Sequence, residues 1–313
     1  MNTNARAWIS FIVLGSVWGG SFLFIKVIGR DLTPFTLVAV RLGLASLALW
    51  IFALATHVRF PTSWKVIGGL ALVGAIKNTI PFIMIAVGQQ WIDSGVSSIL
   101  NSATPLFTLA IAQFALRDER ITWYSGIGML VGFGGIIIIS SRSISSLEIA
   151  DWQALAGHIL MIAATIFFAL TAIISRRFFR DIDPIVMSVI TISAAFFFAL
   201  VVALIVDRPI NLVMQPEAIA ALLVLSLAGT ALANYLYFYI ILVWGATRAS
   251  LVTYVSPVVG LILGVLVLHE PLDWRLFAGF IMVLSAIAIA SLKPGARPPS
   301  SSSSREVRAT GRS

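Results

Sequence analysis

Ten long apolar segments, joined by short polar connections, account for almost the whole chain. An α-helix needs about 20 apolar residues to cross a hydrocarbon core about 30 Å thick, and each segment comes close to that length. We expect the membrane-spanning helices at about 8–29, 32–55, 65–88, 92–116, 123–141, 152–175, 184–206, 217–243, 246–268 and 273–292. The pattern therefore predicts an all-α integral membrane protein with ten transmembrane helices.

The last five segments repeat landmarks of the first five. Lys26 precedes Pro34 by eight residues, and in the second half Arg176 precedes Pro184 by eight. A glutamate at the end of the fourth segment, and another at the end of the ninth, is followed by Trp four residues later and by Gly nine residues later. Because five is an odd number, the second half must cross the membrane in the opposite sense to the first.

This repeat predicts how the chain is divided. We expect an N-terminal segment over 1–7, a first five-helix repeat over 8–141, a linker over 142–151, a second repeat over 152–292 and a disordered basic tail over 293–313. Two inverted repeats with a polar site between them are typical of secondary transporters.

Composition supports a membrane protein and excludes several kinds of site. Charged residues make up 11% of the chain and hydrophobic residues 59%, whereas soluble domains average about 25% charged residues. The net charge of +8 comes from basic residues beside the apolar segments and in the tail, so we expect no nucleic-acid partner. The absence of cysteine excludes disulfides, thiolate metal sites and a cysteine nucleophile.

The positions of lysine and arginine predict the orientation. If the N-terminus is cytoplasmic, fourteen basic residues fall on the cytoplasmic side and four on the opposite side. This bias follows the positive-inside rule. We therefore expect both termini in the cytoplasm, the linker over 142–151 outside, and the protein in the inner membrane with lipid around it.

Several landmarks are shared with a known family. Those in the first half are Trp18-Gly19-x-Ser21, Pro34 and Arg41. Those in the second half are Gly229, Phe238-Tyr239, Ser256-Pro257, Glu270 and Gly279. In these residues the chain resembles the EamA domains of the drug/metabolite transporter superfamily. The resemblance implies ten helices, alternating access, and a cavity lined mainly by helices 1, 3, 4, 6, 8 and 9. It also implies export of amino acids, related metabolites or drugs.

Lys77 is the most informative polar residue inside a predicted span. It lies about twelve residues into the third segment, near mid-depth, with Asn78 next to it and Pro81 one turn further on. A lysine at the centre of a membrane helix costs about 2.5–3.5 kcal/mol even on the lenient insertion scale, so it needs water, a partner or a ligand. It could bind the carboxylate of a substrate, or it could be a structural lysine bonded to carbonyl groups that Pro81 leaves free.

Other polar and aromatic residues inside the spans are candidates for the same site. Arg41 could hold a carboxylate or brace helix ends, and the amide of Asn101 needs a partner in a cavity or in a helix contact. Tyr235 and Tyr239 share a helix face because they lie four residues apart. With Lys77 and Asn78, the predicted substrate-binding residues are Trp18, Arg41, Ser98, Asn101, Asn234, Tyr235, Tyr239 and Tyr254.

Prolines interrupt three of the predicted spans. Pro81 lies in the third, Pro105 in the fourth and Pro257 in the ninth. A proline removes one backbone hydrogen bond and leaves carbonyls free at depth. Pro105 and Pro257 occupy equivalent positions on helices that run in opposite directions. We expect these breaks to let the ends of the two spans close one mouth while the other opens.

The sequence favours a transporter over other classes of membrane protein. It contains neither H-E-x-x-H nor G-x-S-x-G, which an integral membrane enzyme of those kinds would need. Its polar residues form an asymmetric patch, not the ring of like groups expected of a channel. The preferred hypothesis is export of a small carboxylate-bearing zwitterion such as an amino acid, without a cofactor or metal, by a monomer or homodimer. The alternatives are a multidrug or other metabolite permease of the same fold, or an integral membrane enzyme.

Overall fold

The structure is a computed structural model that describes residues 3–115, 123–140, 149–179, 181–208, 210–246, 249, 251–271 and 273–291. Within these residues every regular element is a helix. Eight helical spans are long and apolar enough to cross a membrane, and the two shorter apolar helices at Gly126–Ile139 and Trp274–Ala286 correspond to the fifth and tenth predicted spans. The prediction of an all-α membrane protein with ten transmembrane helices in two inverted repeats is confirmed.

The helices follow the predicted spans closely. In the first half they are α1 (Thr3–Ile28), α2 (Pro34–Ala55), α3 (Trp64–Gly74) with η1 (Ala75–Thr79) and α4 (Ile80–Gly88), α5 (Ser94–Asn101) with α6 (Thr104–Ala115), and α7 (Trp123–Ser140). In the second half they are α8 (Ile149–Phe178), α9 (Pro184–Val206), α10 (Pro216–Ser226) with η3 (Leu227–Leu232) and α11 (Ala233–Trp244), η4 (Leu251–Tyr254) with α13 (Val255–Leu268), and α14 (Trp274–Ser291). Most of the expected linker and all of the expected tail lie outside the described residues.

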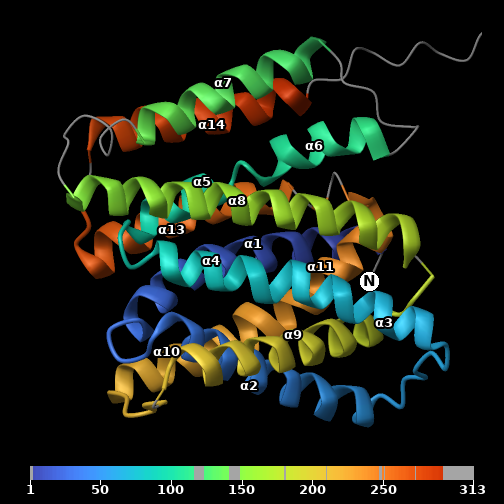
Figure 1. Cartoon of the computed structure of the whole chain (residues 1–313). Coiled ribbons are helices and arrows are strands. Elements are labelled where there is room, and N and C mark those ends of the chain that lie inside the picture. The colour runs from blue at the N-terminus through green and yellow to red at the C-terminus, as the bar shows by residue number, and fades with distance from the viewer. Residues whose placement is uncertain are drawn as a thin grey trace, which may run out of the picture.

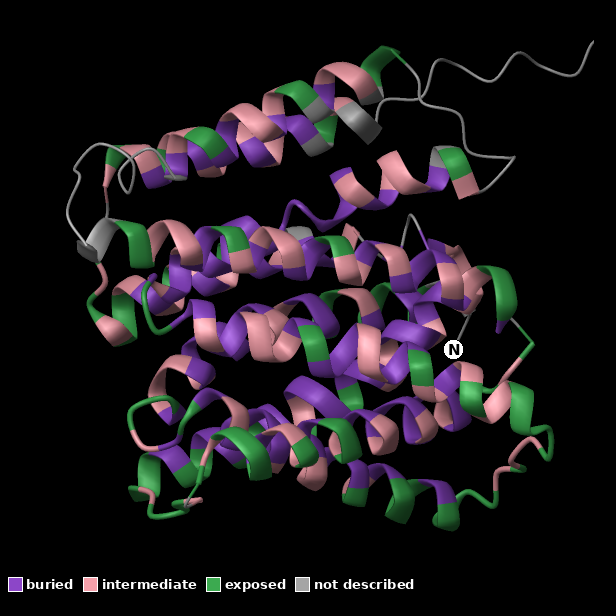
Figure 2. Cartoon of the chain, viewed as in Figure 1, coloured by how far each residue is buried: buried purple, intermediate pink, exposed green. Residues whose placement is uncertain are grey.

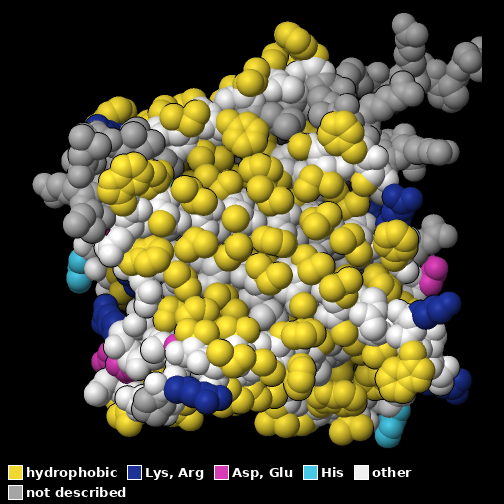
Figure 3. Space-filling model, viewed as in Figure 1, with side chains coloured by type: hydrophobic (Ala, Val, Ile, Leu, Met, Phe, Trp, Pro, Cys, Tyr) yellow, Lys and Arg dark blue, Asp and Glu magenta, His cyan; other side chains and the backbone are white. Residues whose placement is uncertain are grey.

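The helices run side by side along one common direction, as Figure 1 shows. Hydrophobic side chains cover the middle of the visible face in Figure 3, while the basic, acidic and histidine side chains gather at its two ends. Leu47, Ile51 and Ile205 are among the large apolar residues that are 60% or more exposed. An apolar band between two charged rims is the surface that a bilayer requires.

The two halves are interlocked, because the main helix contacts join one repeat to the other. α1 packs on α13, and in the reciprocal pair α8 packs on α5 and α6. α4 packs on α8, and its counterpart is the contact of α1 with α10 and α11. α2 packs on α9, and α7 on α14. Each pair maps onto another, or onto itself, when the repeats are exchanged, as an internal pseudo-two-fold axis requires.

Four spans are interrupted, three of them near their middle and the ninth close to its start. The third contains the π-helical segment η1 and the eighth the π-helical segment η3, at equivalent places in the two repeats. The fourth breaks between α5 and α6, and the ninth starts with the 3₁₀ segment η4. Pro81, Pro105 and Pro257 each lie in the first turn of the helix that follows an interruption, where proline is tolerated. Irregular backbone at membrane depth is stable only where protein or a cavity surrounds it.

The interior is apolar at its core, with buried polar residues at these interruptions. In Figure 2 the buried residues lie on the helix faces that point inward. Lys77, Asn78 and Thr79 of η1 and Thr230 of η3 are all almost completely buried. The interruptions therefore bring polar groups of both repeats to the centre of the bundle.

Candidate functional site

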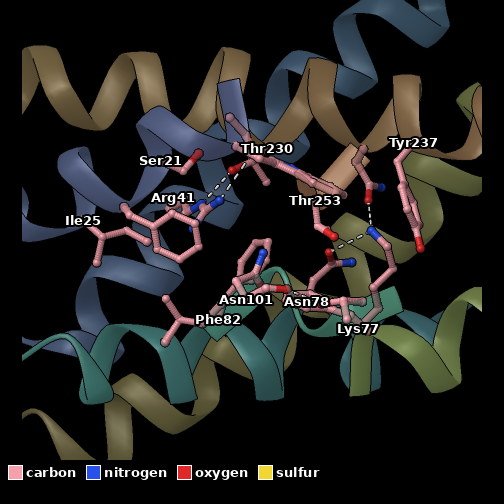
Figure 4. Close-up of a pocket in the computed structure, with 17 residues that line it drawn as sticks. Ser21, Ile25, Arg41, Lys77, Asn78, Phe82, Asn101, Thr230, Tyr237 and Thr253 are labelled. Carbon is pink, nitrogen blue, oxygen red and sulfur yellow. Dashed lines mark hydrogen bonds between the residues drawn. The ribbon is translucent and has the colours of Figure 1, made fainter. Parts of the chain in front are cut away.

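A cavity lies at the centre of the bundle where the four interrupted spans meet α1, α2 and α8. Figure 4 shows the residues around it. They are Trp18, Ser21, Phe22, Ile25, Arg41, Lys77, Asn78, Phe82, Ile85, Asn101, Thr104, Phe168, Gly229, Thr230, Asn234, Tyr237 and Thr253. Among the described residues this lining contains two basic side chains and no acidic one, so the cavity favours a negative charge.

Lys77 is held on one side of the cavity by neutral groups. Its ammonium donates hydrogen bonds to the Oδ1 atom of Asn234 and, at 3.3 Å, to the Oδ1 atom of Asn78. It also lies 4.9 Å from the ring centroid of Tyr237 and 5.1 Å from that of Phe238. These contacts are favourable to a cation, but none carries a negative charge. Lys77 is only 3% exposed, so its charge is buried without a counterion among the groups that line the cavity.

Two amide groups on the cavity wall have unused hydrogen-bonding capacity. The Nδ2 atom of Asn78 and the Oδ1 atom of Asn101 are buried and have no partner in the described part of the chain. Asn78 is 1% exposed and Asn101 is 5% exposed. Leaving a buried donor or acceptor unpaired costs about 1–3 kcal/mol, so both groups are suited to a ligand.

Arg41 lies on the opposite side of the cavity and is tied to the second repeat. Its Nε atom donates to Oγ1 of Thr230 at 2.7 Å, and its guanidinium donates to the carbonyl of Gly229 at 3.3 Å. The guanidinium also stacks 4.0 Å from the ring centroid of Phe82. Arg41 thus braces the π-helical segment η3 and at the same time keeps a positive charge on the cavity wall.

The second repeat has no arginine at the position equivalent to Arg41, and Lys77 supplies a positive charge near that place. Arg41 lies seven residues after the proline that begins α2, and Thr191 lies seven residues after the proline that begins α9. Thr191 has no charge, but its Oγ1 accepts a hydrogen bond of 3.2 Å from Nδ2 of Asn234, and Asn234 in turn accepts from Lys77. Lys77 therefore places a charge on the side of the cavity where the repeat predicts an arginine.

Aromatic rings form much of the remaining wall. Trp18 and Tyr237 are 5.3 Å apart between ring centroids, and Phe82 and Phe168 are 6.3 Å apart. These rings come from both repeats. A polar and cationic patch enclosed by aromatic and apolar walls is the usual composition of a site for a small organic molecule.

The structure brings together six of the ten residues predicted to bind substrate. Those that line the cavity are Trp18, Arg41, Lys77, Asn78, Asn101 and Asn234. Ser98 does not line it, because its side chain packs against Gly260 of α13 and its hydroxyl donates to the carbonyl of Gly95 at 2.7 Å. The side chain of Tyr254 lies outside the described residues.

Tyr235 and Tyr239 also lie away from the cavity. They stack on one another with centroids 6.5 Å apart, and Tyr235 contacts Phe52 of α2. Tyr237 lines the cavity instead, because it lies three residues after Asn234 and so shares its helix face. Tyr237 was not among the predicted site residues, and its spacing of three residues from Asn234 was the signal in the sequence that could have identified it.

A second pocket adjoins the cavity at the end of the bundle where α1 ends. The two share Ile25, and the second pocket also includes Lys26 and Glu270. Lys26 donates to the carbonyls of Gln89 at 2.7 Å and Ile92 at 2.8 Å, in the turn between α4 and α5. The two pockets therefore border on the same residue of α1. The described residues contain no group of three or more His, Asp or Glu side chains that could hold a metal ion.

Comparison with known proteins decides the family. The sequence profile described as the EamA-like transporter family matches residues 6–141 and again 155–292. The chain belongs to the EamA-like transporter family. Because the profile matches twice, this EamA-like transporter carries the family's unit in each of its halves.

Named relatives agree with that assignment. An uncharacterized transporter of Archaeoglobus fulgidus is 26% identical over 289 residues, which cover 92% of this chain and 99% of the relative. The uncharacterized transporter YoaV of Bacillus subtilis is 22% identical, covering 90% of this chain and 95% of YoaV. The uncharacterized inner membrane transporter YedA of Escherichia coli is 24% identical, covering 79% and 78%. A solved crystal structure superposes with a TM-score of 0.69 at 16% identity, over 92% of this chain and 97% of the other, which shows a common fold.

Proposed function

We propose that this EamA-like transporter exports a small organic solute that bears a carboxylate, an amino acid or a similar zwitterion, by alternating access. The observation that supports this substrate is Lys77, a buried cation beside the unpaired Nδ2 donor of Asn78. Both groups are hydrogen-bond donors, and both face a cavity whose described lining contains no acidic side chain. A carboxylate would accept from both at once, and charge-assisted bonds of this kind are roughly twice as strong as neutral ones.

The mechanism rests on the arrangement of the repeats around this cavity. Helices of both halves line it, and the main helix contacts pass from one half to the other. A rocking motion between the halves would expose the same site first on one side of the membrane and then on the other. The interrupted spans provide ends that can move without breaking a continuous helix.

Transport assays test the substrate class directly. We expect purified protein in proteoliposomes to exchange a radiolabelled amino acid across the membrane, and Lys77→Met to weaken binding about tenfold or more, as loss of a charged hydrogen bond predicts. Lys65→Met is the matched control, because Lys65 lies at the start of the same span and is exposed. Unchanged kinetics in well-folded Lys77→Met protein would make the lysine structural and refute the proposed site.

One observation favours a second candidate. The aromatic walls formed by Trp18, Phe22, Phe82 and Phe168 would also suit a permease for apolar compounds. Such a permease would transport uncharged aromatic solutes, and Lys77→Met would leave that transport intact or improve it. The carboxylate proposal predicts the opposite order, with uncharged analogues binding more weakly than the acids.

We propose that both termini are cytoplasmic and that the protein lies in the inner membrane, on the basis of its charge distribution and its relatives. The basic residues favour a cytoplasmic face at both termini, and the Escherichia coli relative is named an inner membrane transporter. Alkaline phosphatase fused at Ser145 should be active, whereas a fusion at Ser300 should be inactive and a fluorescent protein there should glow. Phosphatase activity at Ser300, or none at Ser145, would overturn the orientation.

A further inference from the structure

We infer that Asn101 accepts a hydrogen bond from a donor group on the solute, and that the site therefore binds 2-amino and 2-hydroxy acids in preference to 2-oxo acids. This inference rests on the proposed carboxylate site and adds a second point of recognition to it. It assigns to Asn101 a specificity role that the carboxylate-binding groups cannot fill, because Lys77 and Asn78 only donate to the solute.

The position of Asn101 follows from the break in the fourth span. α5 ends at Asn101, a turn follows at Ser102, and α6 begins at Thr104. The hydroxyls of Ser102 and Thr104 donate to backbone carbonyls of the same break, Thr104 to the carbonyl of Asn101 itself at 2.7 Å. These bonds satisfy the backbone and leave the side chain of Asn101 on the cavity wall without a partner for its Oδ1 atom.

The charges around the cavity fix which end of the amide faces the solute. An asparagine amide can be reversed, which would exchange its acceptor for donors. The cavity lining carries the positive charges of Lys77 and Arg41 and no negative side chain. An amide oxygen directed at that interior is attracted to both charges, whereas an amide NH₂ group would be repelled. Asn101 therefore presents an acceptor.

The two unpaired amides complement a solute with two kinds of polar group. Nδ2 of Asn78 beside Lys77 donates to a carboxylate, and Oδ1 of Asn101 accepts from an ammonium or hydroxyl group. A 2-oxo acid has the carboxylate but no donor, so it would leave Oδ1 of Asn101 unpaired and buried. Sites built around a hydrogen bond reject analogues that lack the bonding group strongly for this reason.

Binding of matched acids to the purified full-length protein tests the inference. Three triplets serve as probes: alanine, lactate and pyruvate, and the corresponding 2-amino, 2-hydroxy and 2-oxo acids of leucine and of phenylalanine. For the triplet that binds best, we expect the amino and hydroxy acids to bind at least about tenfold more tightly than the oxo acid. Asn101→Leu should reduce that ratio to about twofold or less, because the amino and hydroxy acids should bind more weakly while the oxo acid binds as before or more tightly.

Control variants separate recognition from stability. Ser94→Ala is the matched control, since Ser94 lies on the same helix and its Oγ atom is also buried without a partner, but it does not line the cavity. It should leave the ratio unchanged. Asn101→Ala removes the acceptor and keeps a small residue at the end of α5, so it should reproduce the loss if Asn101→Leu does not fold.

The possible outcomes separate this inference from the proposed function. Equal binding of all three members of a triplet to the wild-type protein, or an unchanged ratio in both Asn101 variants, would overturn the role of Asn101 and leave the carboxylate site standing. No binding of any acid would overturn the proposed function, and the inference with it.

Discussion

The carboxylate of Glu270, two residues beyond the end of α13, accepts a hydrogen bond of 2.8 Å from the backbone N–H of Ser94 at the start of α5. Its second oxygen accepts from the N–H of Gly95 at 2.9 Å. The first N–H groups of a helix have no partner within the helix, and a negative charge is stabilising beside them. The N-cap residue of α5, Asp93, makes no capping hydrogen bond with its own side chain. The second repeat therefore caps a helix of the first.

We predict that Glu270→Gln lowers the stability of the protein by about 1 kcal/mol, as loss of a charged helix cap does elsewhere. Glutamine keeps one acceptor but loses the charge and the second acceptor. Thermal unfolding in detergent would measure the change. Glu217→Gln is the matched control, because Glu217 is a glutamate at the start of a helix, in the first turn of α10, but is exposed. Equal melting temperatures for the two variants would contradict a capping role for Glu270.

The contact between Arg41 and Thr230 predicts an energetic coupling between the repeats. We expect a double-mutant cycle with Arg41→Met and Thr230→Val to give a coupling of about 1–3 kcal/mol, the usual value for a buried hydrogen bond to a charged group. Thr230 also donates to the carbonyl of Leu225 at 2.8 Å, but the cost of losing that bond cancels in the cycle. Titration of unfolding with sodium dodecyl sulfate would measure each corner.

The control cycle pairs Arg41→Met with Thr191→Val. Thr191 is the residue of the second repeat that corresponds to Arg41. Its hydroxyl is bonded to Asn234 and to α9 itself, not to Arg41. Coupling near zero is expected there. Coupling of the same size in both cycles would mean that the effect spreads through the bundle and does not report the bond to Thr230.

The spans and the main cation of the site could be predicted from the sequence for a simple reason. A run of about 20 apolar residues has few stable alternatives to a membrane helix, and an ionisable residue in its middle must face the interior. Lys77 satisfies both conditions. The side chains of Arg41, Asn78 and Asn234 followed because polar groups at that depth also have to find partners inside the protein.

The faces of individual helices were harder to predict. The stacked pair Tyr235 and Tyr239 lies on the side of α11 that contacts α2, and Tyr237 lines the cavity. Both faces carry tyrosine, so residue type alone does not distinguish them. The π-helical segments η1 and η3 were not predicted either. Each is a local widening of the helix that tertiary contacts stabilise, such as the hydrogen bonds from Arg41 to η3. No periodicity in the sequence indicates such a widening.

The prolines at the breaks should affect the rate of transport more than the affinity. We predict that Pro105→Ala and Pro257→Ala each slow turnover several-fold while changing the dissociation constant by about twofold or less, since they alter the balance between states and not the contacts with solute. Single-turnover exchange in proteoliposomes, compared with equilibrium binding, would separate the two quantities. Pro216→Ala is the control, because Pro216 begins α10 at an exposed end where proline is benign. A pure loss of affinity in either variant would assign that proline to the binding site.

A crosslink between the repeats tests the rocking motion most directly, and the natural absence of cysteine makes the experiment clean. A Cβ atom added at Gly88 of α4 would lie 3.6 Å from Cβ of Leu160 of α8, which suits a disulfide between Gly88→Cys and Leu160→Cys. The two helices belong to different repeats, and both contribute side chains to the cavity. We predict that oxidation of this pair lowers exchange to about one tenth or less and that a reductant restores it, since alternating access needs the halves to move.

The control crosslink joins two helices that contribute nothing to the described cavity lining. A Cβ atom added at Gly135 of α7 would lie 3.1 Å from Cβ of Met282 of α14. Although α7 and α14 also belong to different repeats, they pack on each other beside the rest of the bundle (Figure 1) and line no part of the described cavity. We expect their mutual contact to stay fixed while the cavity opens and closes, so oxidation of Gly135→Cys with Met282→Cys should leave exchange near its normal rate. Normal exchange in the oxidised Gly88 and Leu160 pair would rule out a rocking motion at that contact. The solute would then have to pass through the cavity while the halves stay fixed, as it would in a channel.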